Sequence, residues 1–189
     1  MEQITLAEAV KLKSILTRKI HQLEEEMERV AFATVEKGEQ AEAGPRTVEA
    51  VEQELDEVRK DTRLLDKLMY RANIDHEISF KGENLAIVEA IELATQLRAK
   101  ARMYKEFGSS AKEEVQFGYS DSTVFYRVAL FDPEEYRQKA IQLEKKAHKL
   151  SNLINAKNYA IQLEFNGANI FNPGKVRLFS GAWSEDGTP

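Results

Sequence analysis

The sequence predicts a mainly α-helical protein: an antiparallel bundle of about four long, coiled-coil-like helices with an inserted β-hairpin and a C-terminal arm. In three stretches the apolar residues recur in alternating three- and four-residue steps, which places them on one narrow stripe of a helix. Before the last of these stretches the apolar residues alternate at every second position, as in a β-strand. The helical stripes are Leu16, Ile20, Leu23, Met27 and Val30; Val48, Val51, Leu55, Val58, Leu65, Met69 and Ala72; and Tyr136, Ala140, Leu143, Ala147, Leu150 and Ile154.

The first predicted helix begins after Thr5 and continues to about Val35. Thr5 is a good N-cap, and Glu8 stands three residues later, where its carboxylate can accept from the N–H of Thr5 in a capping box. Gly38 and the Gly44-Pro45 pair end this helix, because glycine and proline interrupt helices.

The second predicted helix covers about residues 47–72, starting at Thr47. A short loop between two long amphipathic helices normally makes them antiparallel neighbours. Residues 73–82 are predicted to form a polar connector, and a third helix is predicted at about residues 83–107. Its apolar positions are denser and less regular, so we expect it to pack on more than one neighbour.

A β-hairpin is predicted at about residues 113–131. Apolar residues alternate on both sides of Ser120-Asp121-Ser122, which favours two strands joined by a turn. A lone two-stranded hairpin is marginally stable in water. Its aromatic side chains are therefore expected to pack on helices or on another subunit.

The last helix is predicted from Asp132 to about Ala160. Asp132 is an N-cap, Pro133 occupies the first helical position, and Glu135 can complete a capping box. Residues 1–165 are thus predicted to form one helical domain. Residues 166–189 form an arm that contains Trp183 among several apolar residues, so this arm is expected to dock.

Composition excludes several classes of protein. The formal net charge of −5 and a pI near 5.4 argue against general binding to nucleic acid duplexes. The chain has no cysteine, which excludes disulfides and thiolate metal sites. We expect a cytoplasmic protein of a bacterium, or of a virus that infects one, because neither a secretory signal nor a membrane-spanning apolar run is seen.

Charge is distributed unevenly between the helices. Residues 23–61 are rich in Glu and Asp, whereas the last helix carries Arg137, Lys139, Lys145, Lys146, Lys149 and Lys157. One interpretation is that complementary charges set helix pairing. The other is that the basic residues form a binding face for an anionic ligand.

The sequence does not predict an enzyme, a cofactor or a metal site. Nucleotide-binding, hydrolase and zinc motifs are missing. Glu144 and His148 have helical i,i+4 spacing, but a second pair of the kind found in di-iron bundles is lacking, so surface placement is expected.

Six polar or aromatic residues form a candidate ligand-binding site. Asparagine is unfavourable inside helices and useful at their ends, so capping is the simpler interpretation. The alternative is that helix ends meet in a polar pocket, with an arginine that holds an anion and a tyrosine that stacks on the ligand. The six residues are Arg71, Asn73, Tyr126, Asn155, Asn158 and Tyr159.

The chain resembles the septicolysin-like family of bacterial and phage-related proteins over about residues 5–165. The matching features are Leu6-Ala7-Glu8-Ala9, Glu36-Lys37-Gly38-Glu39 to Pro45, Arg71-Ala72-Asn73, Glu83-Asn84-Leu85 with Glu89-Ala90, and Asn155-Ala156-Lys157-Asn158-Tyr159. The family name implies a cytolysin, and the resemblance supplies no catalytic residues.

Three functional hypotheses follow. The first is a non-enzymatic, homo-oligomeric binding protein that captures a small anionic or nucleotide-type ligand, as a phage counter-defence protein would. The second is a structural or assembly coiled-coil protein of a phage or bacterium. The third is a septicolysin-like cytolysin, although stable membrane insertion of the hairpin is not expected.

Overall fold

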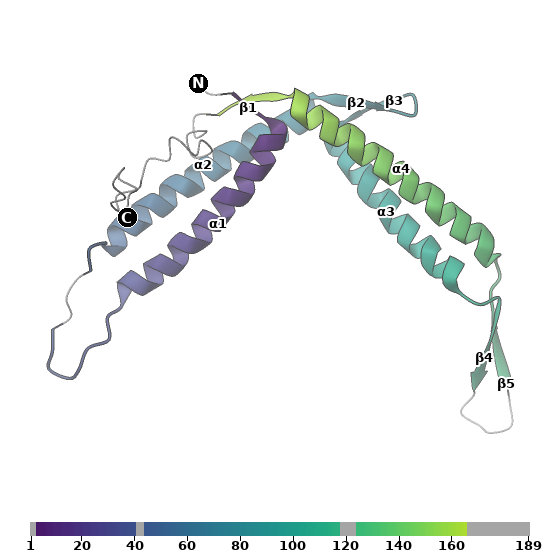
Figure 1. The fold of residues 1–189 in the computed structure, drawn as a ribbon, viewed down its shortest axis with the longest axis horizontal. Coiled ribbons are helices and arrows are strands. Elements are labelled where there is room, and N and C mark those ends of the chain that lie inside the picture. Colours follow the sequence, from purple (N-terminus) through teal and green to yellow (C-terminus); the bar gives the residue numbers. More distant parts are fainter. Residues whose placement is uncertain (1–2, 41–43, 118–123, 166–189) are drawn as a thin grey trace, which may run out of the picture. The chain divides into compact units, whose positions relative to one another are not determined.

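The computed structural model describes residues 3–40, 44–117 and 124–165, and these residues form four long helices and three small antiparallel strand pairs (Figure 1). The mainly helical fold with an inserted hairpin is thereby confirmed. The predicted arm at residues 166–189 and the turn at residues 120–122 lie outside the described residues. The elements in order are β1 (Gln3–Thr5), α1 (Leu6–Ala31), α2 (Val48–Asp75), β2 (Glu77–Phe80), β3 (Glu83–Ala86), α3 (Ile87–Ser109), β4 (Glu113–Phe117), β5 (Val124–Val128), α4 (Pro133–Ala160) and β6 (Gln162–Glu164).

The chain divides into two compact units. The terminal unit comprises residues 1–72 and 158–189, and the central unit comprises residues 73–157. In the terminal unit α1 and α2 form an antiparallel pair, joined by ion pairs such as Lys13–Asp66 at 2.7 Å. In the central unit α3 pairs with α4, and the Arg98 guanidinium donates to the hydroxyl of Ser151 between them.

The terminal unit has a heptad core. Every seventh residue is buried on α1 from Ala9 through Leu23, and every seventh residue is buried on α2 from Val51 through Ala72. Such spacing keeps one stripe of each helix facing its partner. The buried seam residues are Ala9, Leu16 and Leu23 on α1 and Val51, Val58, Leu65 and Ala72 on α2.

The strand pair β1–β6 adds to this core. Ile4 pairs with Leu163, and the N–H of Leu6 donates to the carbonyl of Ile161 at 2.9 Å. Phe165 follows β6 and is fully buried. The beginning of α1 is therefore covered by residues from the far end of the described chain.

The central unit has a core of small residues. Ile87, Ala94, Ala101 and Gly108 recur every seventh position on α3, and Ala140, Ala147 and Ile154 do so on α4; all are buried. Small side chains at the contact positions allow two helix backbones to approach closely. At Gly108 the approach is so close that an added Cβ would lie 2.8 Å from the Cα of Arg137.

The helix boundaries follow the local chemistry. The predicted Thr5–Glu8 capping box is confirmed, since the N–H of Thr5 donates to Glu8 at 2.7 Å and the N–H of Glu8 donates to Thr5 at 3.1 Å. The predicted limits of α4 are also confirmed, and the Asp132 carboxylate accepts from the N–H of Glu134 at 3.0 Å. The carboxylate of Glu135 pairs with Lys139 at 2.6 Å.

Three boundaries differ from the prediction. The second helix continues to Asp75 rather than ending at about residue 72. The first helix ends at Ala31 rather than near Val35, because residues 31–35 are all exposed and the β-branched Thr34 and Val35 have low helix propensity. The third helix begins at Ile87 rather than at Glu83, because residues 83–86 pair as β3 with β2. The polar connector predicted at residues 73–82 is therefore partly a hairpin.

Candidate functional site

The six residues predicted to bind a ligand do not all come together. Asn155, Asn158 and Tyr159 share one side of the last turns of α4, since residues three and four positions apart are neighbours on a helix. Arg71 and Asn73 lie in the last turns of α2, two positions apart, and so do not face the same side. Each group satisfies the expectation that polar residues gather at helix ends.

Tyr126 is separated from the asparagines. It lies in β5, which precedes the N-terminal end of α4, whereas Asn155 lies near the C-terminal end. From Pro133 to Asn155 the helix rises about 33 Å, at about 1.5 Å per residue. Figure 1 shows the β4–β5 hairpin beyond the start of α4. Of the two tyrosines predicted to stack on a ligand, Tyr126 therefore does not line one pocket with Asn155 within a single chain, whereas Tyr159 lies one turn from Asn155 on α4.

The side chains of the predicted site differ in burial. Arg71, Asn155 and Tyr159 are exposed, and Asn73 and Asn158 are half-buried. The amide oxygen of Asn158 is buried and accepts no hydrogen bond from the residues that the structure describes. Only Asn158 among the six thus has a buried polar atom in need of a partner.

A polar cluster interrupts the heptad core of the terminal unit. Glu54 on α2 is 8% exposed, and its Oε1 lies 2.9 Å from the Nζ of Lys19 on α1. The guanidinium of Arg46 contacts the other oxygen of Glu54 and also Glu26 on α1 at 3.2 Å. Burial raises the pKa of Glu54, but the hydrogen bonds and charges of Lys19 and Arg46 outweigh burial, so the pKa is lowered. Because these charges neutralise one another, the cluster is structural.

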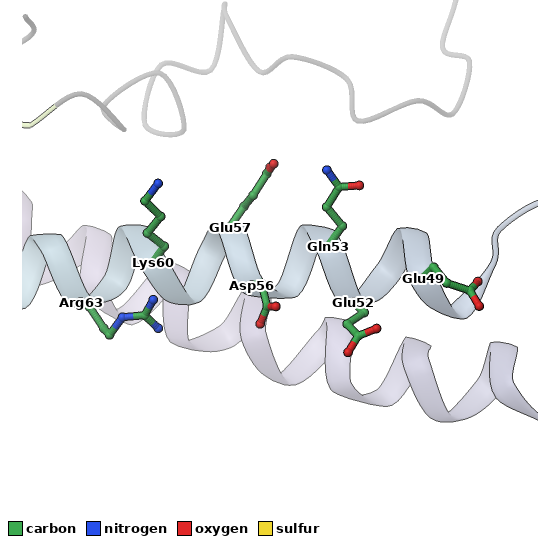
Figure 2. A pocket seen from close by; sticks show the side chains of 7 residues that line it. All are labelled: Glu49, Glu52, Gln53, Asp56, Glu57, Lys60 and Arg63. Atoms are coloured by element: carbon green, nitrogen blue, oxygen red, sulfur yellow. The ribbon is translucent and has the colours of Figure 1, made fainter.

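The exposed face of α2 carries an open hollow of about 570 Å³. Figure 2 shows that Gln53, Glu57 and Lys60 point to one side of α2, whereas Glu52 and Asp56 point to the other. The side chains do not converge on one point, as a ligand would require. We therefore interpret this surface as a solvated acidic helix face.

A second hollow, of about 510 Å³, lies at the base of the β4–β5 hairpin. Its lining is largely apolar, with a charged rim. The lining residues are Glu106, Phe107, Ser110, Ala111, Glu114, Arg127, Val128, Ala129, Leu130 and Phe131. We call it the hairpin groove.

A cluster of aromatic rings holds the hairpin groove in place. The ring of Phe107 on α3 lies 5.2 Å from that of Phe131, which follows β5, and both contact Tyr136 on α4. The two pairs with Tyr136 are edge-to-face, and such pairs fix geometry as well as burying area. The prediction that hairpin aromatics pack on helices is thus confirmed for Phe131.

One face of the hairpin is apolar and exposed. Residues directly opposite each other point to the same face of an antiparallel pair, and Val115 lies opposite Tyr126. Val124 and Val128 lie on the same face, two positions from Tyr126 on either side. These four side chains are between 47% and 56% exposed, and Leu130 beside them is 97% exposed. This apolar face and the hairpin groove form a continuous candidate interaction site in the central unit.

The sequence contained part of the evidence for this site. The alternation of apolar residues indicated the strands, but Leu130 and Phe107 gave no functional signal by themselves. Their role depends on the end of α3 and the end of β5 meeting, which local patterns cannot show.

Neither metal ligation nor membrane spanning is visible in the described part of the chain. Its His, Asp and Glu side chains form no group of three suited to hold a metal ion. His21 instead lies 3.2 Å from Glu24 on the surface of α1. In residues 3–40, 44–117 and 124–165 no helix is both long and apolar enough to cross a membrane.

Comparison with known proteins gives a fold and a family. A crystal structure of a functionally unknown conserved protein from Corynebacterium diphtheriae is similar, with a TM-score of 0.64 and 23% sequence identity over 86% of this chain and 100% of that one. The likeness shows that the two share a fold. No curated protein matches the chain. A family model described as a family of unknown function (DUF6847) matches residues 13–163, and the chain belongs to this family.

Proposed function

We propose that this protein is a non-enzymatic, homo-oligomeric binding protein of the bacterial or phage-infected cytoplasm, and that its ligand is a small anion. The observation that carries the self-association is the apolar face of the β4–β5 hairpin, formed by Val115, Val124, Tyr126 and Val128. Two-stranded hairpins are marginal alone, and exposed apolar area costs about 25 cal/mol per Å² relative to buried area. Covering this face would stabilise the hairpin.

The occupant that fits this surface best is a second copy of the chain. The lining of the hairpin groove carries both signs of charge, with Glu106 on α3 and with Glu114 and Arg127, which lie directly opposite each other in the β4–β5 pair. A two-fold axis places the same patch opposite itself, so Arg127 of each copy can face the carboxylates of the other. Leu130, almost fully exposed, supplies an apolar side chain for the partner's groove.

Self-association is tested by light scattering coupled to size exclusion, from about 1 to 100 μM protein. We expect the wild type to form a closed oligomer that Leu130→Asp and Val124→Asp convert to single subunits. Phe32→Asp is the matched control, because Phe32 is an 84% exposed apolar residue in the terminal unit. Single subunits at every concentration of wild type would contradict the proposal.

The proposed anionic ligand is supported by the basic side chains of α4 that have no carboxylate partner. Arg137 and Lys139 are neutralised by Glu134 and Glu135 at 2.9 and 2.6 Å, but Lys146 and Lys149 make no ion pair with the residues described in the structure. A thermal-shift screen against nucleotides should show stabilisation of the wild type. The predicted ligand role of Arg71 is tested in the same screen with Arg71→Ala.

The other two hypotheses are tested by the same light-scattering series and by one further assay on liposomes. Assemblies that grow without limit as concentration rises would favour a structural or assembly protein. Release of dye from liposomes would favour a cytolysin, as the resemblance to the septicolysin-like family implies; that resemblance stays a prediction.

A further inference from the structure

One order of elements occurs twice along the chain. A strand, two long helices and a strand follow one another as β1, α1, α2 and β2, and again as β3, α3, α4 and β6 (Figure 1). In both sets the first strand leads directly into its helix, and a single residue separates the second helix from the last strand. The second helices, α2 and α4, both contain 28 residues. We call residues 3–80 the first module and residues 83–165 the second module.

The two modules begin with similar sequences. Each first helix opens with an apolar residue, followed by a glutamate two positions later, an alanine and a further apolar residue. The glutamate has the same role in both modules, since Glu8 accepts from the N–H of Thr5 at 2.7 Å and Glu89 accepts from the N–H of Ala86 at 2.9 Å. A capping box by itself is common, but the matching apolar positions around it indicate repetition. The matching segments are Leu6-Ala7-Glu8-Ala9-Val10 and Ile87-Val88-Glu89-Ala90-Ile91.

The two modules also end alike. An aliphatic residue of the last strand is followed, after one exposed residue, by a phenylalanine, and both apolar side chains are buried. The phenylalanine comes at the same distance in sequence from the start of α2 as from the start of α4. The buried pairs are Ile78 with Phe80 in the first module and Leu163 with Phe165 in the second.

Each last strand pairs with the first strand of the other module. In the β1–β6 pair Ile4 lies opposite Leu163, and in the β2–β3 pair Leu85 lies opposite Ile78. Ile4 and Leu85 hold matching places, two residues before the first helix of each module, and Leu163 matches Ile78. The register of the two strand pairs is therefore the same.

The backbone hydrogen bond at the start of each first helix is repeated as well. The N–H of Leu6 donates to the carbonyl of Ile161, and the N–H of Ile87 donates to the carbonyl of His76, both at 2.9 Å. Each acceptor is the residue between the second helix and the last strand of the other module. A contact made by position i of one copy with position j of the other, and repeated in reverse, is the pattern of a homodimer. This chain has that pattern between its two halves.

We propose that the two modules are copies of one unit, and that the start of each first helix, with its first strand, is a docking site for the last strand of a second copy. The partner that fits the site is a strand with an apolar residue, a polar residue and a phenylalanine in succession. Two-stranded pairs are marginal in water, so burial of these two apolar side chains stabilises the docked strand. The Lys81-Gly82 turn, with φ of 54° and 88°, links the modules covalently at one of the two strand pairs.

This docking is separate from the self-association proposed above. The hairpin groove belongs to the second module, where the β4–β5 hairpin lies between the two helices. In the first module the described residues between α1 and α2 form no strand. The two interactions therefore use different surfaces.

The test is the full chain with a protease site inserted between Lys81 and Gly82, folded first and then cut. At about 1 μM the cut protein should have the same mass in light scattering as the uncut protein, because both strand pairs hold the modules together. Leu163→Asp and the matching Ile78→Asp should each weaken the association of the cut modules at least tenfold. Glu164→Ser is the matched control, because Glu164 is exposed. Modules of the wild type that separate after cutting, or that stay together in both aspartate variants, would overturn the proposal.

Engineered cysteines test the shared register without disturbing the buried positions. The natural chain has no cysteine. Gln3→Cys with Glu164→Cys, and Asn84→Cys with Ser79→Cys, place cysteines at matching pairs of opposite residues. Both pairs should form disulfides, because opposite residues of an antiparallel pair have Cα atoms close enough for the bond. Gln3→Cys with Gln162→Cys is out of register and should not, since diagonal neighbours are about 7–8 Å apart. A disulfide between positions 79 and 84 without one between 3 and 164 would contradict the exchange of last strands.

Discussion

Gly108 of α3 and Arg137 of α4 meet backbone to backbone. A Cβ added to Gly108 would lie 2.8 Å from both the Cα and the N of Arg137, which is closer than atoms of a backbone normally approach. The Arg137 guanidinium also donates to the carbonyl of Gly108, at 3.4 Å. The heptad positions on α3 thus end in a glycine that permits the backbones of α3 and α4 to approach closely.

Gly108→Ala should destabilise the central unit. In an open helix position alanine is more stable than glycine by about 1 kcal/mol. Here the added methyl group meets backbone that cannot move independently, so we expect a net loss of about 1–3 kcal/mol. Urea denaturation followed by circular dichroism measures the change. Gly44→Ala is the control, since a Cβ there meets nothing within 4 Å, and an equal loss in both variants would contradict the close contact.

Thr5→Ala should weaken the start of α1. The variant loses the acceptor of the Glu8 N–H, which costs about 1 kcal/mol at an N-cap. The pKa of Glu8 is lowered by hydrogen bonds from the backbone and side chain of Thr5, so it should rise partway towards its ordinary value. Denaturation and a carboxylate NMR titration check both results. Thr17→Ala, which removes a mid-helix hydroxyl, should leave the pKa of Glu8 unchanged.

Leu65→Ala should lower the free energy of unfolding much more than Leu64→Ala, although the two residues are adjacent. Leu65 is fully buried in the seam of α2, whereas Leu64 is 41% exposed. Removing a buried leucine side chain costs about 2–5 kcal/mol, because transfer energy is lost and a cavity remains. We expect less than about 1 kcal/mol at Leu64. If the two variants unfolded at similar urea concentrations, Leu65 would not be buried in the seam and the assignment of the heptad core would be wrong.

The stability of the terminal unit should depend on pH through Glu54. Its pKa in the folded protein is lowered, so its contribution is fully present above the unfolded pKa and is lost as pH falls through the folded pKa. Glu54→Gln should cost about 1–3 kcal/mol at pH 7, because Lys19 and Arg46 lose their charged partner. The difference from wild type should shrink as the pH falls below about 4.5, the ordinary value for a glutamate.

The control for this prediction is Glu52→Gln on the exposed face of α2. It should lie within about 0.5 kcal/mol of wild type at every pH. Asp61 acts in the opposite direction, because burial raises its pKa. Because Asp61 is present in wild type and in both variants, its contribution cancels when their free energies of unfolding are compared at the same pH. A pH-independent difference for Glu54→Gln would reject the ion-pair explanation.

Local signals predicted the helices well. The Thr5–Glu8 capping box and the Asp132-Pro133 start lie in consecutive residues, so their chemistry is complete in the sequence. The β2–β3 hairpin was missed for a local reason: Lys81-Gly82 lacks the usual asparagine or aspartate, and Glu83-Asn84 resembles a helix start. The alternation of Ile78 and Phe80 was the signal that could have found it.

The features that local signals did not predict are those that depend on residues distant in sequence. β1 pairs with β6 across about 160 residues, and three-residue strands have no periodicity to recognise. The candidate pocket failed in part for a different reason: the predicted hairpin at residues 113–131 already put Tyr126 before the start of the last helix and Asn155 near its end, and the length of that helix keeps the two apart.

The pairing of β1 with β6 has a consequence for biosynthesis. The central unit is one uninterrupted stretch of chain and is complete once residue 157 has left the ribosome. The core of the terminal unit cannot be completed until Leu163 and Phe165 have emerged, although its first helix is translated earliest. The N-terminal segment therefore stays unfinished through most of translation, and a nascent chain stalled before residue 160 should expose it to protease.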